Sequence, residues 1–295
     1  MVILVYISEI QRENSLKKKL LQRVKYFFNI IDIKNKEEKN IFFLPIYDNK
    51  KTRKYKIKYL SKKIVKNIKD EDYVVLSQSL QRISILKNIL YSENINILNG
   101  RYLFKCLNIN ILYYILNAKN ENIESQEISI LINDFNAINK DIVIELAQKV
   151  KTLNIITNNI DKFIKIEKYL YSEYGIVLNI LNNKKNGLLK AKIIINIDFP
   201  EELINQYRIY SKAVIINILN KIEIQSKKFN GVNINYFTIE MPEKYKIAGF
   251  KDEEVYESII YNYNYKQVQE RCKEDNIEIR NLIGNKGIIL EHEFM

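Results

Sequence analysis

Short apolar runs alternate with helix-like segments along the first part of the chain. Four of these runs have the length of strands and cover residues 2–7, 41–46, 73–76 and 95–98. Between them, apolar residues recur at three- and four-residue steps, the period of a helix, over residues 16–31, 60–68 and 80–90. A further helical pattern follows the turn at Asn99-Gly100 and covers residues 101–115. This alternation predicts an α/β domain over residues 1–120.

The clearest pattern of the chain lies between residues 125 and 220, after a polar stretch at 118–126 that we interpret as a domain boundary. Strand candidates cover residues 127–133, 153–157, 176–180, 192–197 and 213–218, and helix candidates cover 141–150, 162–174, 184–190 and 201–207. Strands that are apolar on both faces and alternate with helices predict a parallel sheet covered on both sides. Ligands of such sheets bind at the carboxyl ends of the strands.

The remaining residues, 221–295, predict a C-terminal extension made of a helix and a hairpin. A strand candidate covers residues 232–239, and a helical pattern runs from 253 to 272. Apolar runs at 277–283 and 288–294 flank Gly284-Asn285-Lys286-Gly287, which is typical of a hairpin turn. The same turn could also bind a phosphate, and the hairpin is the interpretation that we favour.

Three local strings in residues 125–220 resemble the nucleotide-binding domain of shikimate dehydrogenases and glutamyl-tRNA reductases. The first, residues 133–139, stands where those enzymes place a glycine-rich loop for the cofactor pyrophosphate. The second, 157–159, stands where they place an arginine for the 2′-phosphate of NADP, and the third, 196–200, is similar to a string beside the nicotinamide ribose. The resemblance implies a Rossmann-like fold and NAD or NADP as cofactor. It places the following residues around that cofactor: Asn133, Asp134, Asn136, Thr157, Asn158, Asn159, Asn196 and Asp198.

These strings depart from the family pattern at the positions that hold phosphate. Residues 133–139 contain no glycine, so a Cβ on every residue obstructs close approach of a phosphate, and Asp134 adds negative charge. Asn159 replaces the arginine, and a neutral amide cannot make a bidentate phosphate contact. The catalytic motifs of both enzymes are not recognisable. The sequence therefore predicts a degenerate form of this domain, with weak or no binding of NAD(P).

Other candidate chemistry is sparse. Asp134 and Asp198 follow the first and fourth central strands, so they could act as acid and base or bind a cation. Alternatively, each caps the following helix, and capping is the interpretation that we favour. Gly100 and Arg101 stand between a strand and a helix, where they could bind an anion or simply form a turn. His292 is the only histidine, which excludes a histidine triad or a two-histidine metal site within one chain. No catalytic residue and no metal site are predicted.

The net charge of +12 raises the possibility of a nucleic-acid partner. The densest cationic stretch, residues 50–69, interleaves lysines with Tyr55 and Tyr59, a pattern that can combine phosphate contacts with base stacking. Lysine is abundant along the whole chain, however, so a solvated helix face is the interpretation that we favour.

The cysteines and the apolar runs of the sequence indicate the cellular compartment of the protein. Cys106 and Cys272 have no CxxC spacing, which indicates neither a disulfide framework nor a zinc site. No basic region precedes the apolar run near residue 1, and no run reaches the length of a membrane helix. We therefore expect a cytoplasmic protein without a membrane partner; the sequence sets no oligomeric state.

Three functions are compatible with the sequence. The first is a dehydrogenase-like protein with a degenerate nucleotide site that serves as a binding or regulatory module. The second is an enzyme that acts on a small anionic metabolite in a cleft between domains, through Arg101, Asp134 and Asp198. The third is a nucleic-acid-binding protein that uses residues 50–69.

Overall fold

The computed structural model describes residues 4–9, 15–36, 39–46, 54–68, 73–182, 184 and 186–294. The chain forms two compact units. Unit 1 contains Met1–Gly100 and Pro242–Tyr261, and unit 2 contains Arg101–Met241 and Asn262–Met295. The divisions expected at residues 118–126 and near residue 220 both fall inside unit 2.

Unit 1 is built on a five-stranded sheet with the order β2-β3-β1-β4-β5. Its strands are β1 (Leu4–Glu9), β2 (Asp32–Lys36), β3 (Lys39–Leu44), β4 (Tyr73–Leu76) and β5 (Asn96–Ile97). All neighbours pair in parallel except β2, which runs antiparallel to β3 at the edge. The sequence Asp-Ile-Lys-Asn-Lys of β2 lacks an apolar run because an edge strand buries little, and for this reason the sequence pattern does not predict it.

The helices of unit 1 are α1 (Leu16–Phe27), α2 (Lys54–Val65), α3 (Ser84–Ser92) and α9 (Asp252–Ile260), with 3-10 turns at Leu80–Arg82 and Glu243–Tyr245. The core gathers buried side chains of β1, β3 and β4 with those of α2 and α3. Residues 47–53 and 69–72, and with them both ends of the cationic stretch at 50–69, lie outside the described residues.

Helix α9 returns to unit 1 from late in the chain. The hydroxyls of Tyr6 and Ser258 lie 2.6 Å apart, and Glu257 Oε2 accepts the backbone N–H groups of Asn99 and Gly100 at 2.9 and 2.6 Å. The single helix expected over residues 253–272 is therefore wrong. It is two helices, α9 and α10 (Tyr265–Glu274), and Asn264 begins the second through a reciprocal capping box with Gln267.

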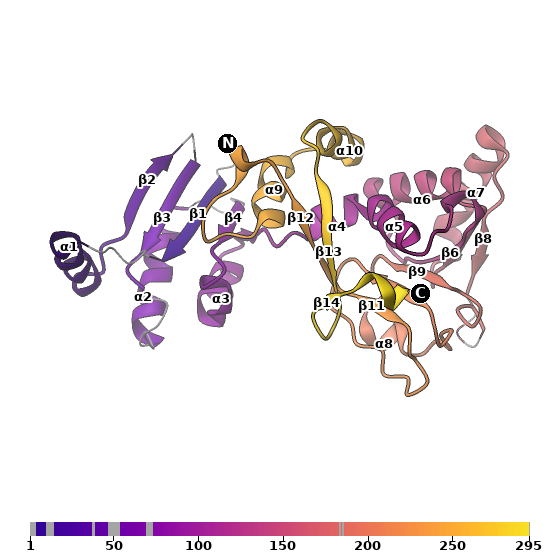
Figure 1. Ribbon diagram of the computed structural model, residues 1–295, viewed down its shortest axis with the longest axis horizontal. Helices are drawn as coiled ribbons and strands as arrows, with labels where there is room; N and C mark the ends of the chain where they lie inside the picture. Colours follow the sequence, from indigo (N-terminus) through magenta and orange to yellow (C-terminus); the bar gives the residue numbers. More distant parts are fainter. Residues whose placement is uncertain are drawn as a thin grey trace. The chain divides into compact units, whose positions relative to one another are not determined.

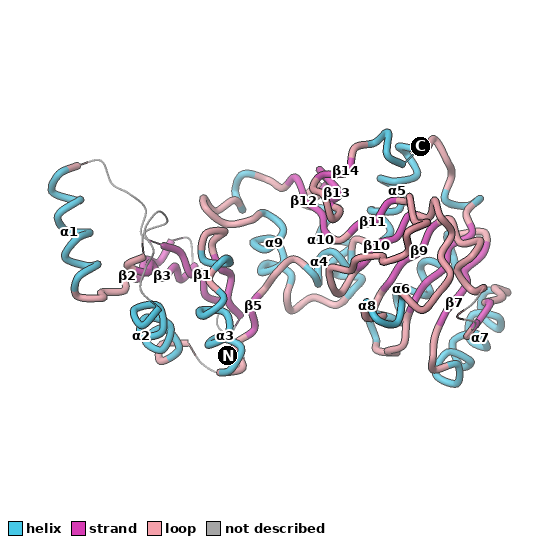
Figure 2. Tube along the Cα trace, turned by 90° about the horizontal axis from the view of Figure 1, so that it is seen from below, coloured by secondary structure: helices cyan, strands magenta, loops and turns pink. Residues whose placement is uncertain are grey.

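Unit 2 contains an all-parallel six-stranded sheet with the order β8-β7-β6-β9-β10-β11 (Figures 1 and 2). Its strands are β6 (Glu127–Leu131), β7 (Thr152–Ile156), β8 (Asn179–Leu181), β9 (Ile193–Asn196), β10 (Val214–Asn217) and β11 (Val232–Ile234). Numbered from β6, this is the 3-2-1-4-5-6 order of the Rossmann fold. The predicted fold class, α/β with a parallel Rossmann-like sheet, is confirmed.

The strands β9 and β10 are buried along their whole length, because helices cover both faces of this sheet. Figure 1 shows α6 (Ala137–Lys149) above the sheet and α8 (Glu201–Ile204) below it. The other helices are α4 (Arg101–Cys106), α5 (Asn108–Ala118) and α7 (Ile160–Tyr174), with a 3-10 turn at Ile123–Ser125. The helix expected at 184–190 is not formed over the described residues 186–190, which make turns and a bridge from Leu188 to Ile209.

A small antiparallel sheet, β12-β13-β14, completes unit 2. It consists of β12 (Tyr236–Glu240), β13 (Glu278–Ile283) and β14 (Ile288–Ile289), and the predicted hairpin turn joins the last two. The single strand expected over 232–239 is wrong, because Asn235 leaves the parallel sheet and donates its N–H to Ile283 O at 2.7 Å. After β14 the chain forms a 3-10 turn, Glu291–Phe294, in place of the longer expected strand.

Candidate functional site

The candidate site is the topological switch point of the six-stranded sheet. From β6 the chain builds β7 and β8 on one side, and then crosses to build β9, β10 and β11 on the other side. The carboxyl ends of β6 and β9 are therefore neighbours from which the chain leaves in opposite directions. Open α/β sheets bind their ligands at this position.

Asp198 joins the two loops that leave the switch point. Its Oδ1 accepts the N–H of Asn133, and its Oδ2 accepts the N–H of Asp134, both at 2.7 Å. In dinucleotide-binding folds, backbone N–H groups of this turn point at the cofactor pyrophosphate. Here a carboxylate of the protein itself takes these donors.

Burial raises the pKa of Asp198 above its ordinary value, and the nearby Asp134 adds to this effect. The two backbone N–H groups and the amino group of Lys105 oppose it, because they favour the charged carboxylate. Asp198 is half-buried, whereas Asp134 is exposed. The environment thus makes the proton affinity of Asp198 higher than that of an ordinary surface aspartate.

Neither aspartate caps a helix. The N-cap of α6 is Asn136, whose Oδ1 accepts the N–H of Asn139 at 3.0 Å, and the residue at the N-cap of α8 is Pro200. The Nδ2 of Asn136 also donates to Asp134 Oδ2 at 2.8 Å. The capping interpretation of Asp134 and Asp198 is therefore wrong, and both side chains belong to the polar groups of the switch point.

The end of β7 is tied to the same loop. Asn133 Oδ1 accepts the N–H of Asn158 at 2.8 Å and the hydroxyl of Thr157 at 3.4 Å. Asn159 Nδ2 donates to Asn133 O at 3.1 Å. The residues at the expected position of the NADP arginine thus bind the neighbouring turn of the protein.

Asn196 lies at the end of β9 in a buried ladder of asparagines. Its Nδ2 donates to Asn217 Oδ1 at 3.2 Å, and its Oδ1 accepts the N–H of Phe199 at 2.9 Å. Asn217 continues the ladder through its own Nδ2 to Asn233 Oδ1 at 2.7 Å. The ladder joins the carboxyl ends of β9, β10 and β11.

The two residues expected to bind an anion have partners within the protein. Gly100, in unit 1, donates its N–H to Glu257. Arg101, in unit 2, donates from Nη1 to Asn217 O at 3.2 Å and Ile218 O at 3.0 Å, and its guanidinium carbon lies 5.2 Å from the centre of the Tyr236 ring. The guanidinium therefore anchors α4 to the end of β10.

Lys105 is the residue of this region that the sequence pattern does not identify. It lies four residues after Arg101 on α4, is half-buried, and has Asp198 and Asp134 among its charged neighbours. Burial lowers the pKa of its amino group, and the thiol of Cys106 and the two aspartates oppose that shift. Its only signal in the sequence is the four-residue spacing from Arg101, which is not distinctive in a chain with 47 lysines and arginines.

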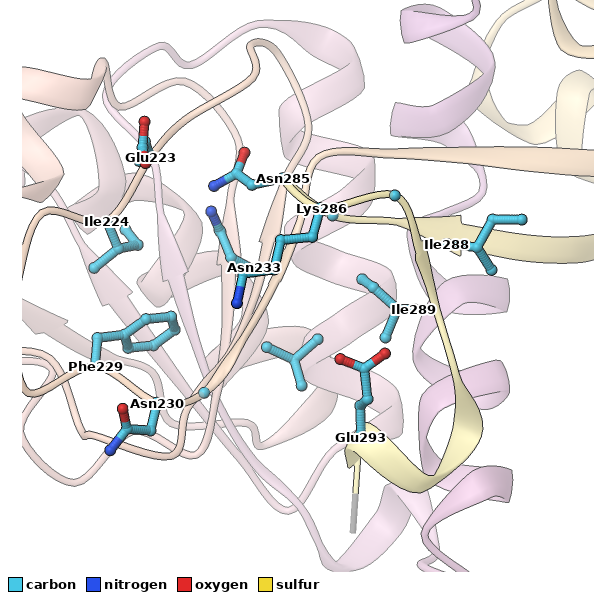
Figure 3. Close-up of a pocket in the computed structure, with 14 residues that line it drawn as sticks. Glu223, Ile224, Phe229, Asn230, Asn233, Asn285, Lys286, Ile288, Ile289 and Glu293 are labelled. Atoms are coloured by element: carbon cyan, nitrogen blue, oxygen red, sulfur yellow. The ribbon is translucent and has the colours of Figure 1, made fainter.

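A cavity of about 490 Å³ lies beside the edge strand β11, away from the switch point. Figure 3 shows it between residues 223–233 and the C-terminal hairpin. The turn that we considered for phosphate, Gly284 to Gly287, forms part of its lining and contributes Asn285 and Lys286. The lining also contains the carboxylates of Glu223 and Glu293, which counter the positive charge of the lysine.

Within the described part of the chain, no group of three histidine, cysteine, aspartate or glutamate side chains could hold a metal ion. Among the same residues, no helix combines the length and apolar character needed to cross a bilayer. Cys106 and Cys272 are buried thiols that are not joined in a disulfide.

No family model matches the chain, and no curated protein matches it. Solved structures that match include L-tryptophan dehydrogenase from Nostoc punctiforme, at 8% identity over 93% of this chain and 88% of that chain with a TM-score of 0.36. Another is the A chain of dipicolinate synthase from Bacillus subtilis, at 9% identity over 92% and 97% with a TM-score of 0.42. A third is aspartate transcarbamoylase from Trypanosoma cruzi, at 10% identity over 76% and 74% with a TM-score of 0.31. Matches at this level carry no conclusion about activity or ligand.

Proposed function

We propose that unit 2 is a binding or regulatory module of dehydrogenase-like architecture whose nucleotide site is degenerate. The observation that carries this proposal is the position of Asp198, whose carboxylate accepts both N–H groups of the turn after β6. An internal anion replaces the cofactor pyrophosphate there. The module keeps the switch point of the fold but presents different groups at it.

Electrostatics supports weak or no binding of NAD(P). A pyrophosphate at this turn would have to displace the Asp198 carboxylate and lie next to it and Asp134, and like charges at contact distance repel strongly. The side chains of Thr157 and Asn159 are also engaged with the same turn. Binding of a dinucleotide would therefore break hydrogen bonds within the protein for each contact that the dinucleotide made.

An enzyme acting on a small anionic metabolite is less well supported, because the guanidinium of Arg101 already binds two backbone carbonyl groups, those of Asn217 at the end of β10 and of Ile218.

One observation favours a nucleic-acid-binding role. Tyr55 and Tyr59 on α2 are 67% and 54% exposed, and they stand beside exposed lysines at 54, 58 and 62.

Isothermal titration calorimetry with NAD and with NADP should detect no binding at cofactor concentrations up to about 1 mM. The reason is the competition between the pyrophosphate and the Asp198 carboxylate for the same backbone donors. A dissociation constant in the low micromolar range for either cofactor would overturn the proposal. The Asp198→Asn variant serves as the matched control, since it removes the charge and keeps the size of the side chain.

Replacing Lys54, Lys58 and Lys62 by glutamine should leave the affinity for single-stranded RNA unchanged, because we interpret these lysines as a solvated face. Lys56 and Lys63 stay unchanged, since their amino groups donate to Tyr26 O and Asn29 O within unit 1. Fluorescence anisotropy at several salt concentrations measures the effect. Tight wild-type binding whose salt slope falls by roughly one unit per lost phosphate contact would show instead that α2 binds nucleic acid.

A further inference from the structure

Helix α1 of unit 1 turns apolar side chains toward solvent. Five of them, on the helix and directly after it, are between 42% and 79% exposed: Leu20, Leu21, Val24, Phe27 and Phe28. They lie on one face, because residues three, four or seven positions apart in a helix stand above one another. Exposed apolar residues are ordinary when they are isolated, but a contiguous group marks an interaction site. We call these five residues the α1 face.

The opposite side of α1 packs against the rest of unit 1. Gln22 and Tyr26, one helical turn apart, are half-buried. Lys56 of α2 donates from Nζ to Tyr26 O at 2.6 Å, and the same atom lies 3.0 Å from the centre of the Tyr26 ring. Lys25 Nζ lies 2.6 Å from Asp32 Oδ2 at the start of β2, and Figures 1 and 2 both show α1 next to this edge strand. The helix is thus held through its polar side, which leaves the α1 face outward.

Basic residues flank the α1 face on both sides. Lys19 and Arg23, one turn apart, follow one side of it, and Lys18 and Lys25, two turns apart, follow the other. The helix contains four lysines and one arginine but no acidic residue. The side chains of Lys18, Lys19 and Arg23 are exposed. A partner of this surface must therefore combine an apolar region with negative charge.

An anionic lipid bilayer has this combination at its surface. Amphipathic helices with Phe and Leu on one face and Lys and Arg on the other lie in the plane of the surface, with the apolar face about 5–10 Å deep at the boundary between headgroups and acyl chains. Anionic headgroups attract the basic residues at the same time.

Two other partners match the α1 face less well. Contact between the α1 faces of two copies of the chain would bring the basic residues of both helices together, and like charges repel. A nucleic acid offers phosphates and base faces, but it has no apolar region for aliphatic side chains such as Leu20, Leu21 and Val24.

We propose that α1 docks unit 1 onto the surface of an anionic lipid bilayer. The helix lies parallel to the surface, with Phe27 and Phe28 among the acyl chains and Lys19 and Arg23 among the headgroups. Such a helix needs no bilayer-crossing length, so this partner differs from the spanning case that the short apolar runs of the sequence argue against. The inference concerns unit 1 and is independent of the function proposed for unit 2.

Flotation of the full-length protein with lipid vesicles tests this inference. Vesicles of phosphatidylcholine with about 30% phosphatidylserine provide the anionic surface, and vesicles of phosphatidylcholine alone provide the neutral one. The protein should float with the anionic vesicles, and less of it should float as the salt concentration rises. Absence of flotation with the anionic vesicles, or equal flotation with both kinds, would overturn the inference.

Replacing both Leu20 and Phe27 by glutamine should lower the partition coefficient on the anionic vesicles by about tenfold or more, because two apolar side chains no longer enter the bilayer. Both positions are exposed, so the fold should be kept, which circular dichroism verifies. The matched control replaces Val177 and Leu219 of unit 2, which are 65% and 53% exposed, by glutamine and should float like the wild type. Unchanged flotation of the variant at positions 20 and 27 would overturn the inference.

Replacing Lys19 and Arg23 by glutamine should lower the partition coefficient by about fivefold for each charge removed. The matched control removes two exposed charges from α7, through Lys162→Gln and Lys165→Gln, and should change it less. Sedimentation velocity tests the second copy as the partner. A wild-type dimer that becomes a monomer when residues 20 and 27 are replaced would overturn the inference and assign the α1 face to self-association.

Discussion

Replacing Gly231 by alanine is expected to lower the free energy of unfolding by about 3 kcal/mol, since overpacking against a backbone that cannot move is strongly destabilising. A Cβ at this position would lie 2.1 Å from Ala213 O and 2.8 Å from Ala213 N. Both atoms belong to the backbone just before β10, where Val232 N–H pairs with the same carbonyl. Relief of the clash requires β11 to move away from β10. Urea denaturation followed by circular dichroism measures the loss.

Gly175 provides the matched control for this substitution. It ends α7 with a φ of +67°, and a Cβ at this position would have no neighbouring atom within 4 Å, so alanine there suffers only backbone strain. We expect Gly175→Ala to cost about 1 kcal/mol, the usual penalty of a left-handed conformation for a residue with a side chain. An equal loss in the two variants would mean that close packing at Gly231 does not determine the effect.

The second large effect concerns pH and Glu254 in unit 1. The side chain of Glu254 is only 3% exposed, and burial raises its pKa from 4.5 to about 7. Lys251 lowers the pKa through a contact of 3.0 Å, while the neighbouring Glu253 and Glu257 raise it. Gln81 Nε2 also donates to the carboxyl group.

The folded state therefore binds this proton more tightly than the unfolded state does. The stabilisation is fully present below pH 4.5 and is lost as the pH rises through about 7. A shift of this size corresponds to about 2 to 3 kcal/mol between pH 5 and pH 8. We expect unit 1 to be more stable at pH 5 than at pH 8 by that amount.

Urea denaturation of Glu254→Gln at both pH values tests this expectation, because glutamine cannot titrate and the pH dependence should shrink by about 2 to 3 kcal/mol. Glu243→Gln is the control, since Glu243 is 87% exposed and pairs with Lys246 at the surface. Its pH dependence should match that of the wild type. A wild-type pH dependence that persists in Glu254→Gln would assign the effect to another carboxyl group.

The central sheet could be predicted from sequence because burial on both faces leaves a plain signal. The strands β9 and β10 read Ile-Ile-Ile-Asn and Val-Ile-Ile-Asn, and each is buried at every position. Runs of this kind that alternate with helical segments are typical of a parallel sheet and of few other arrangements. Strand β2, with one apolar residue in five, carries no comparable signal.

The hydrophobic pattern does not predict two breaks, one between α9 and α10 and one between β11 and β12. The reasons differ. The start of α10 has a signal in the sequence, since Asn264 followed three residues later by Gln267 is a capping box. The division between β11 and β12 has none, because Asn235 has its partners at Ile222 and Ile283, and contacts so distant in the chain are not visible in a local pattern.

Some features of the candidate site could likewise be predicted from the sequence, and others could not. Asp134 and Asp198 follow strands of one parallel sheet, so their placement at one edge could be expected from the element order alone. The bonds from Asp198 to the turn after β6 depend on which rotamers fit at that edge. The charges of Asp134 and Asp198 that act on the amino group of Lys105 come from residues far from it in the sequence. Both are consequences of tertiary packing that the spacing of residues does not encode.

The assignment of Pro242–Tyr261 to unit 1 has a consequence for synthesis on the ribosome. The first hundred residues emerge without α9, so Glu257 cannot yet accept the N–H groups of Asn99 and Gly100, and Tyr6 lacks its hydroxyl partner. At usual translation speeds the missing helix follows after on the order of ten seconds. During that interval unit 2 is already being made, so the N-terminal unit begins to fold first and finishes late. The nascent chain is then exposed to chaperones and proteases through its incomplete first unit.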